Sequence, residues 1–200
     1  MNEVNGVFMS KYLVAILLAG AVAAPAYAQD GSTFSGPRVE GIVGYDRAHV
    51  EGENSDGVLY GARVGYDVRA GRAVLGIDGE ITDSTTDECI SGFTVAGDRL
   101  CANAGRDLYV GGRVGAVLSR NAMIYGLAGY TNGRITLDYN DGGTGAANFH
   151  DGRNLDGVRV GAGIQYAIGR NAFVNAEYRY SNYEDGVSRN QVLGGFGVRF

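Results

Sequence analysis

The chain has 200 residues, a length that suits a single domain. It contains 34 glycines and 13 tyrosines but no tryptophan and only two prolines, a composition that favours strands and turns over helices. The mean hydropathy is close to zero, which excludes a bundle of membrane helices. The net charge of −5 is scattered along the chain, so the basic patch of a nucleic-acid-binding protein is absent.

The first 28 residues have the organisation of a secretory signal peptide. Lys11 precedes an apolar run over residues 12–24, and Ala26-Tyr27-Ala28 forms a small-x-small cleavage site. The run is shorter than the roughly 20 apolar residues that a membrane-spanning helix needs. We therefore expect a cleaved signal peptide at 1–28 rather than a membrane anchor.

Two details refine this expectation. Met9 fits the natural start better than Met1, because the acidic Glu3 does not suit the basic beginning of a signal peptide. No cysteine follows the cleavage site, so a lipoprotein is not expected. Residues 29–36 are polar and rich in glycine, and we interpret them as a short leader before the folded domain at 37–200.

The folded domain is predicted to consist of strands with one apolar face. In residues 57–68, Val, Tyr and Ala alternate with Gly, Arg and Asp, and successive side chains of a strand point to opposite faces. The segment 122–132 is the weakest, since both of its phases are apolar, and we expect Ile124, Ala128 and Tyr130 to face outward. The eight expected strands are 37–47, 57–68, 73–82, 106–118, 122–132, 157–168, 172–182 and 190–200.

The connections between these segments alternate in length. Long polar segments, including 83–105 and 133–155, alternate with short turns such as Ser119-Arg120-Asn121 and Gly169-Arg170-Asn171. This alternation is typical of an antiparallel barrel that crosses a membrane, with short turns on the periplasmic side and long loops outside. The sequence therefore predicts an all-β fold, an eight-stranded antiparallel transmembrane up-and-down β-barrel.

Periodicity alone does not say which face points inward, but the chemistry of the polar phase does. That phase is rich in glycine and carries isolated charges of both signs, with very little lysine. Glycine weakens a solvated strand but makes room for long side chains inside a narrow barrel, where Arg and carboxylates can satisfy one another. The apolar phase carries tyrosines near strand ends, as in the aromatic girdles of membrane barrels: Tyr45, Tyr66, Tyr130, Tyr166 and Tyr180. The expected interior charges, with a structural role, are Arg63, Asp67, Asp78, Glu80, Arg113, Arg159, Glu177 and Arg179.

Together these features resemble the small outer-membrane β-barrel family that includes opacity-type proteins and the transmembrane domain of OmpA-like, porin-family proteins. The resemblance covers residues 37–200 and includes Gly-Tyr units of variable spacing, at Gly41–Tyr45, Gly61–Tyr66 and Gly126–Tyr130. The alternating end of the chain, with Phe196, Val198 and Phe200, resembles the signal read by the barrel-assembly machinery. The resemblance implies a Gram-negative outer membrane and contact with its lipid. The peptidoglycan-binding domain of full-length OmpA-like proteins is not expected.

Candidate sites are few. Cys89 and Cys101 lie in one polar segment with eleven residues between them, and an oxidising periplasm favours a disulfide bond over a metal site, because no histidine is near. His49 and His150 are isolated and expected at the surface. The segment beginning at Asp138 lacks the closing Glu of a calcium loop, since Phe149 stands at the twelfth position. We expect no catalytic residue, metal or cofactor.

These observations favour a monomeric, non-enzymatic barrel. Eight strands leave an interior that side chains fill, so the protein would display four long external loops to an extracellular ligand rather than form a pore. Two alternatives remain open. A barrel enzyme acting on membrane lipid would need His49 or His150 as a base, and a soluble periplasmic lipocalin-like barrel would need an apolar interior.

Overall fold

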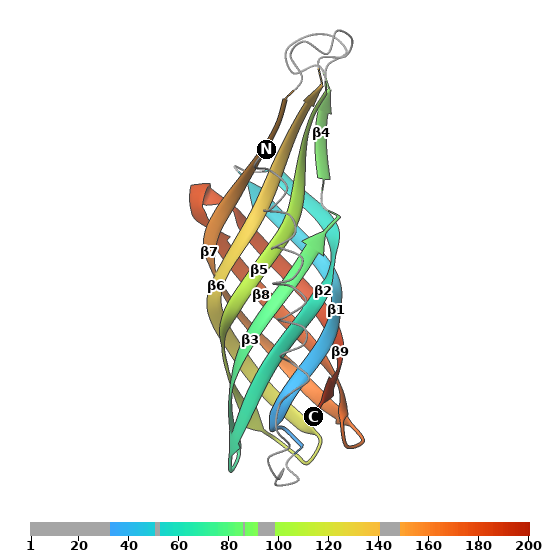
Figure 1. The fold of residues 1–200 in the computed structure, drawn as a ribbon, viewed down its shortest axis with the longest axis vertical. Helices are drawn as coiled ribbons and strands as arrows, with labels where there is room; N and C mark the ends of the chain where they lie inside the picture. The colour runs from blue at the N-terminus through green and yellow to red at the C-terminus, as the bar shows by residue number, and fades with distance from the viewer. Residues whose placement is uncertain (1–32, 51–52, 86, 92–98, 141–148) are drawn as a thin grey trace, which may run out of the picture. The chain divides into compact units, whose positions relative to one another are not determined.

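The computed structural model describes residues 33–50, 53–85, 87–91, 99–140 and 149–200. These residues belong to one compact unit, Ser32–Phe200, and they are almost entirely strand (Figure 1). The expected signal peptide and the first four leader residues lie outside them. The elements are β1 (Gly36–Val50), β2 (Glu53–Ala70), β3 (Ala73–Ser84), β4 (Asp87–Ser91), β5 (Arg99–Val117), β6 (Ala122–Asn140), β7 (Phe149–Ile168), β8 (Ala172–Tyr183), the short 3-10 helix η1 (Glu184–Gly186) and β9 (Ser188–Arg199).

The strands close into a barrel. Among the described strands, neighbours in the sequence pair antiparallel except β3 and β4, and β1 pairs with β9 from Arg38–Arg199 to His49–Ser188. Both β3 and β4 pair with β5, so β4 continues the position of β3 in the sheet rather than adding a ninth position. The closed eight-stranded antiparallel barrel predicted from the sequence is therefore confirmed.

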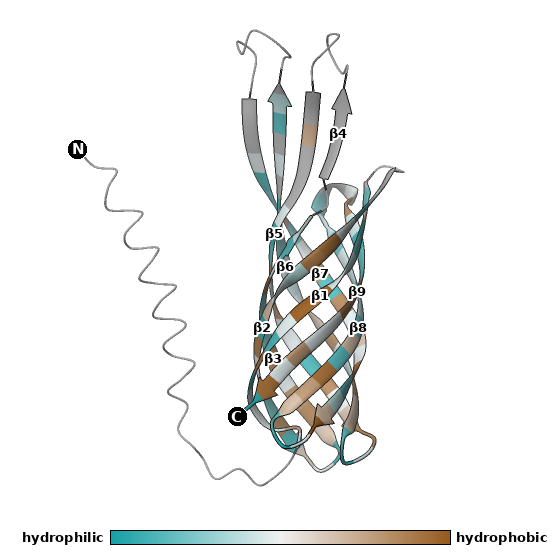
Figure 2. Ribbon diagram, turned by 90° about the vertical axis from the view of Figure 1, so that its right-hand side faces the viewer, coloured by the Kyte–Doolittle hydropathy of each residue, from teal (hydrophilic) through white to brown (hydrophobic). Residues whose placement is uncertain are grey.

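Most large apolar side chains and most charged side chains of the barrel strands lie on opposite faces of the wall. Large apolar side chains point outward, with exposed fractions such as 69% for Ile77 and 61% for Val110. The strands of the barrel carry many apolar residues, drawn brown in Figure 2. Charged side chains point inward, and Arg63 is only 1% exposed. This is the arrangement of a protein whose outer face meets an apolar solvent.

The expected long loops are mostly strand in the structure. Within 83–105, β4 pairs with the beginning of β5, and within 133–155, β6 and β7 pair as far as Tyr139–Phe149. Four strands thus continue past the barrel (Figure 1). The alternating pattern did not reveal them, because a paired strand with water on both faces has no need of an apolar face.

The short-turn end of the barrel is also more ordered than the sequence indicated. Two of its turns contain glycines with positive φ, 64° at Gly71 and 72° at Gly169, a conformation that other residues rarely adopt. Phe34, which the sequence placed in a polar leader, has no exposed surface and packs in a cluster with Val74, Met123 and Ala167. The folded part therefore begins before residue 37.

No helix of the described residues is long and apolar enough to cross a membrane.

Candidate functional site

The barrel interior holds the largest concentration of charge in the described part of the chain. Its buried side chains include seven arginines and seven carboxylates, so their formal charges cancel. The structure places all eight of the charges expected from the sequence there. The full set is Arg38, Glu40, Asp46, Arg63, Asp67, Asp78, Glu80, Asp107, Arg113, Arg159, Glu177, Arg179, Arg189 and Arg199.

Six of these charges were not among the expected interior residues. Four of the six lie on the polar phase of expected strands, so the alternation of polar and apolar residues was enough to predict them. They are Glu40, Asp46, Asp107 and Arg199. Arg38 is at the beginning of β1, where the pattern has barely started. Arg189 lies in β9, in a part of the chain that the sequence suggested was a polar connection.

Arg63 is at the centre of the network. Its guanidinium lies 3.0 Å from Glu40, 2.7 Å from Glu80 and 2.8 Å from Glu177, three carboxylates from three other strands. Tyr125 donates a hydrogen bond of 2.8 Å to Glu177. Because a guanidinium presents five donors in a fixed plane, one arginine can join several strands across the barrel.

Glu80 joins this centre to the end of the barrel from which β4 continues. It also accepts from Arg159 at 3.1 Å and from Arg179 at 2.7 Å. Arg159 also forms an ion pair with Asp107, which accepts a hydrogen bond from the hydroxyl of Tyr183. The chain of contacts therefore runs through β3, β5, β7 and β8 without leaving the interior.

A second group of charges surrounds Asp67, toward the short-turn end. Arg38 donates to Asp67 at 3.1 Å and also pairs with Asp78. Arg113 donates to the same carboxylate at 2.8 Å, and Arg199 from the last strand approaches it to 2.7 Å. Asp67 thus links β2 to β1, β5 and β9.

Interior glycines make space for these groups. A Cβ atom at Gly65 would collide with the carboxylate of Asp78 and the guanidinium of Arg38, and one at Gly76 would collide with Asp67. The interpretation of glycine on the polar phase as room for charged side chains therefore has a direct structural counterpart.

A band of polar contacts marks the outer surface where the apolar belt ends, on the side of β4. Tyr178 donates to Asn190 at 2.7 Å, Tyr130 donates to Asp156, and Tyr45 accepts from Arg47 at 3.2 Å. These tyrosines have apolar neighbours on one side and polar partners on the other, which is typical of the membrane interface.

Arg47 also forms an exposed ion pair beyond this band. It donates to Asp56 on β2 at 2.8 Å. The hydrogen bond from Arg47 holds the pKa of the Asp56 carboxyl below its usual value. Both side chains are exposed, so this contact marks a boundary rather than stabilising the fold appreciably.

The other residues singled out in the sequence are dispersed. Cys89 on β4 lies directly opposite Cys101 on β5 in the strand register, although the side chain of Cys89 is outside the description. Phe196, Val198 and Phe200 point outward with exposed fractions of 59%, 37% and 57%.

The two histidines lie on different hairpins, His49 opposite Asn54 and His150 opposite Asp138. In the described part of the chain, no group of three His, Cys, Asp or Glu side chains could hold a metal ion. The structure therefore brings the interior charges together and opposes Cys89 to Cys101 in the strand register, but leaves the two histidines apart.

Comparison with solved structures finds the same fold. Neisserial surface protein A is 16% identical, with a TM-score of 0.58, and the match covers 83% of this chain and 98% of that one. Ail, the attachment invasion locus protein of Yersinia pestis, is 19% identical, with a TM-score of 0.55 and coverage of 83% and 99%. A second Ail structure, in complex with the heparin analogue sucrose octasulfate, is 18% identical, with a TM-score of 0.53 and coverage of 82% and 99%.

At these identities the likeness concerns the fold alone. None of the curated proteins compared with the chain matches it significantly. Residues 14–200 match the family described as outer membrane protein beta-barrel domain. With its closed barrel, its apolar outer face and its charged interior, this chain belongs to the small outer-membrane β-barrel family.

Proposed function

We propose that the protein is a monomeric, non-enzymatic outer-membrane barrel that interacts with extracellular partners through its extended strands. The observation that carries the proposal is the strand pairing beyond the barrel rim. We call residues 87–91, 99–105, 134–140 and 149–156 the extension; there β5 pairs with both β4 and β6, up to Arg99–Asn140, and β6 pairs with β7.

The extension is suited to binding because it is a paired sheet with open edges. β8 pairs with β7 only from Gly157 onward, so residues 149–156 pair with β6 alone among the described strands. On the other side β4 pairs only with β5 among the strands that the structure describes. Edges of this kind present backbone donors and acceptors to a partner chain.

The barrel supports this role by holding the extension rather than by conducting solutes. Four interior arginines, Arg38, Arg63, Arg159 and Arg179, are among the largest fully buried side chains, and eight strands enclose only enough space for side chains. A neutral network of paired charges in that space favours a filled interior. The interior charges are accordingly structural in this proposal.

Three further expectations belong to the same proposal. The chain is exported through a signal peptide at 1–28, leaving a mature protein that begins at Gln29. The barrel-assembly machinery recognises the last strand, where Phe196, Val198 and Phe200 share the outward face. A disulfide joins Cys89 to Cys101, because directly opposed residues of antiparallel strands have Cα atoms about 4.5–5.5 Å apart, within the range that a disulfide spans.

The alternatives have less support. A soluble lipocalin-like barrel would expose its polar face, whereas here the outward face carries side chains such as Leu75 and Ile164, each 60% exposed. An enzyme acting on lipid would need a base beside other polar groups, and the backbone separates His49 and His150 onto different hairpins.

The proposal can be tested by removing the extension while keeping the barrel. A shortened variant joins Ser84 to Gly105 and Arg134 to Asn154, each through an Asn-Gly turn, which suits a tight hairpin. Cells displaying the full or the shortened protein are compared for attachment to immobilised heparin, to mucin and to one another. We expect attachment to at least one of these surfaces to require the extension, while a gel shift on heating shows that both barrels are folded. The proposal fails if the two proteins behave alike on every surface.

A further inference from the structure

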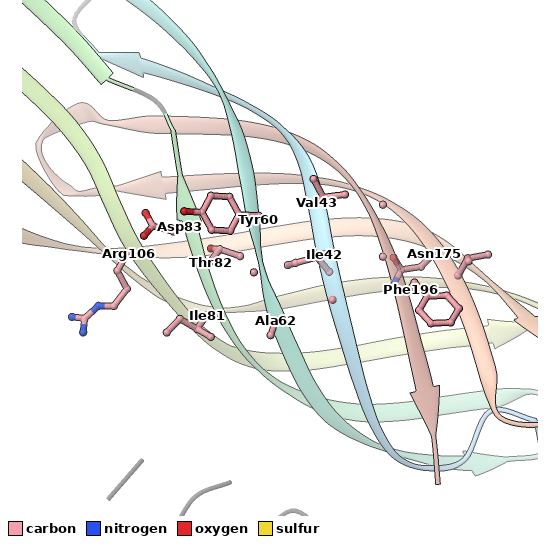
Figure 3. Close-up of a pocket in the computed structure, with 15 residues that line it drawn as sticks. Ile42, Val43, Tyr60, Ala62, Ile81, Thr82, Asp83, Arg106, Asn175 and Phe196 are labelled. Atoms are coloured by element: carbon pink, nitrogen blue, oxygen red, sulfur yellow. The ribbon is translucent and has the colours of Figure 1, made fainter. Parts of the chain in front are cut away.

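The outward face of the barrel carries an apolar groove within the belt of exposed hydrophobic side chains. The groove has a volume of about 1050 Å³ and crosses the strands from β8 and β9 over β1, β2 and β3 (Figure 3). Its floor is formed by the small residues Gly41, Ala62 and Gly194, and its walls include Val43 and Phe196.

The packing of the barrel does not require glycine in this floor. A Cβ at Gly41 would meet no atom within 4 Å, and one at Gly194 would meet only a backbone oxygen at 3.7 Å. By contrast, a Cβ at the inward-facing Gly44 would collide with Leu193. Glycine at these two positions leaves the space on the outer side of the wall open and so deepens the groove.

One end of the groove is polar. Tyr60, Asp83 and Arg106 lie there, while Phe196 lies toward the opposite end (Figure 3). Arg106 is exposed and forms no ion pair with the residues that the structure describes. The carboxylate of Asp83 accepts the backbone N–H of Ser84 at 2.9 Å. Arg106 is therefore a cation beside the apolar groove that has no ion-pair partner among the described residues.

We propose that this groove seats an acyl chain of an anionic membrane lipid, with the lipid phosphate at Arg106. The mainly apolar lining of the groove suits a hydrocarbon chain, and the guanidinium is complementary to phosphate, with which it forms charge-assisted hydrogen bonds. The position of Tyr60 at the polar end agrees with the headgroup level, where tyrosine side chains gather. The carboxylate of Asp83 repels an anion at this end and so limits the affinity of the groove for the lipid phosphate.

The inference rests on the placement of the barrel in a membrane, but not on any role of the extension. It is tested on the purified full chain in detergent by native mass spectrometry, with dioleoyl phosphatidylglycerol as the anionic probe and dioleoyl phosphatidylcholine as the zwitterionic one. We expect one retained phosphatidylglycerol, bound about threefold to fivefold more tightly than phosphatidylcholine, the size of a surface ion pair.

Three substitutions examine the groove itself. Gly41→Leu and Gly194→Leu fill its floor and should weaken retention of both lipids by at least about threefold, since packing contacts drive association between apolar groups in a membrane. Gly112→Leu is the matched control, because Gly112 also faces outward with room for a Cβ but lies outside the groove. Equal retention by all three variants and the unchanged protein would overturn the proposal.

Two substitutions with opposite expected effects on binding test the polar end of the groove. Arg106→Gln should lower phosphatidylglycerol binding to the level of phosphatidylcholine, and Asp83→Asn should raise it. A dimer that Gly194→Leu abolishes would assign the groove to a second copy of the chain and overturn the lipid assignment. A gel shift on heating verifies each barrel. If the unchanged protein showed no gel shift on heating, the membrane barrel itself would be in question. That outcome is distinct from a folded barrel that does not bind the lipid.

Discussion

The barrel and the extension are built from the same strands but obey different rules. Along β8 in the barrel, buried and exposed residues alternate at almost every position. In the extension, Gly152, Arg153 and Asn154 of β7 are three successive exposed residues. The barrel wall separates an apolar surrounding from a charged interior, whereas the extension has similar polar surroundings on its two faces. An alternation of buried and exposed residues therefore shows that the two faces of a strand have different surroundings. A strand whose two faces have the same surroundings lacks it.

The two regions should also differ in what holds them together. In the barrel, buried ion pairs such as Arg63–Glu177 add contacts across the interior to the backbone pairing. In the extension, the strands are joined by backbone pairing, to which the proposed disulfide would add a covalent link. Mutations can test whether the two regions lose stability independently.

The largest effect is expected from breaking the interior network. Arg63→Met leaves the carboxylates of Glu40, Glu80 and Glu177 without their shared partner and should destabilise the barrel by about 3–5 kcal/mol, the cost of an uncompensated buried charge. Urea-dependent folding into vesicles measures the change. Adding Glu177→Gln should restore part of the loss. Arg170→Gln, at an exposed turn, is the control; an equal effect at both arginines would contradict a structural role for the network.

A somewhat smaller effect is expected on the outer face. Lys in place of Val64 or Val160, which are 50% and 52% exposed at mid-strand, should destabilise the inserted barrel by about 2–4 kcal/mol. Asn182→Lys is the matched control, because Asn182 has the same outward phase on β8 just beyond Tyr180. The same vesicle assay distinguishes them, and equal tolerance at all three positions would contradict the outward assignment.

A local effect is expected in the extension. Cys101→Ser removes the proposed link to Cys89, and a link across such a short loop is worth about 2–3 kcal/mol in the chain-entropy view. We expect faster proteolysis of the extension with unchanged unfolding of the barrel. Mass spectrometry after alkylation provides the direct readout, because the unchanged protein should react only after reduction. Alkylation without reduction would show that the cysteines are free thiols.

The smallest effect is expected at the exposed pair Arg47–Asp56. The pKa of Asp56 is lowered in the folded state, so its contribution is present above the ordinary carboxyl pKa and disappears as the pH falls through the lowered value. Because both side chains are exposed to solvent, Arg47→Gln should leave unfolding unchanged between pH 7 and acidic pH. If Arg47→Gln clearly lowered the stability at neutral pH but not at acidic pH, this contact would stabilise the rim of the barrel.

The fold could be predicted because membrane insertion imposes a strict pattern. Residues such as Val58, Val64 and Val68 must face lipid at every second position, so strand number and facing follow from the alternation. The true strand ends could not be read in this way, since β6 continues to Asn140 through residues that have no apolar face. Phe34 was missed for a related reason: one aromatic residue among polar neighbours has no period.

The interior was predictable by residue type but not by partner. The polar phase indicated that Arg63 and Glu177 share a face, while their contact depends on how eight strands curve around one axis. The register that opposes Cys89 to Cys101 is likewise a property of the paired hairpin. The groove at Gly41 and Gly194 depends on neighbours from four other strands, which one-dimensional spacing does not reveal.

The pairing of the first strand with the last has a consequence for the order of events in biogenesis. Arg199 contacts Gly36 across 163 residues, so the seam cannot form until the end of the chain has left the ribosome. Before that moment, Arg63 has no stable access to Glu177, 114 residues away. A partly assembled sheet would present these charges unpaired to lipid, at a cost of several kcal/mol each. Insertion and closure should therefore occur as one cooperative step, late and slow, in keeping with the distant contacts that define the fold.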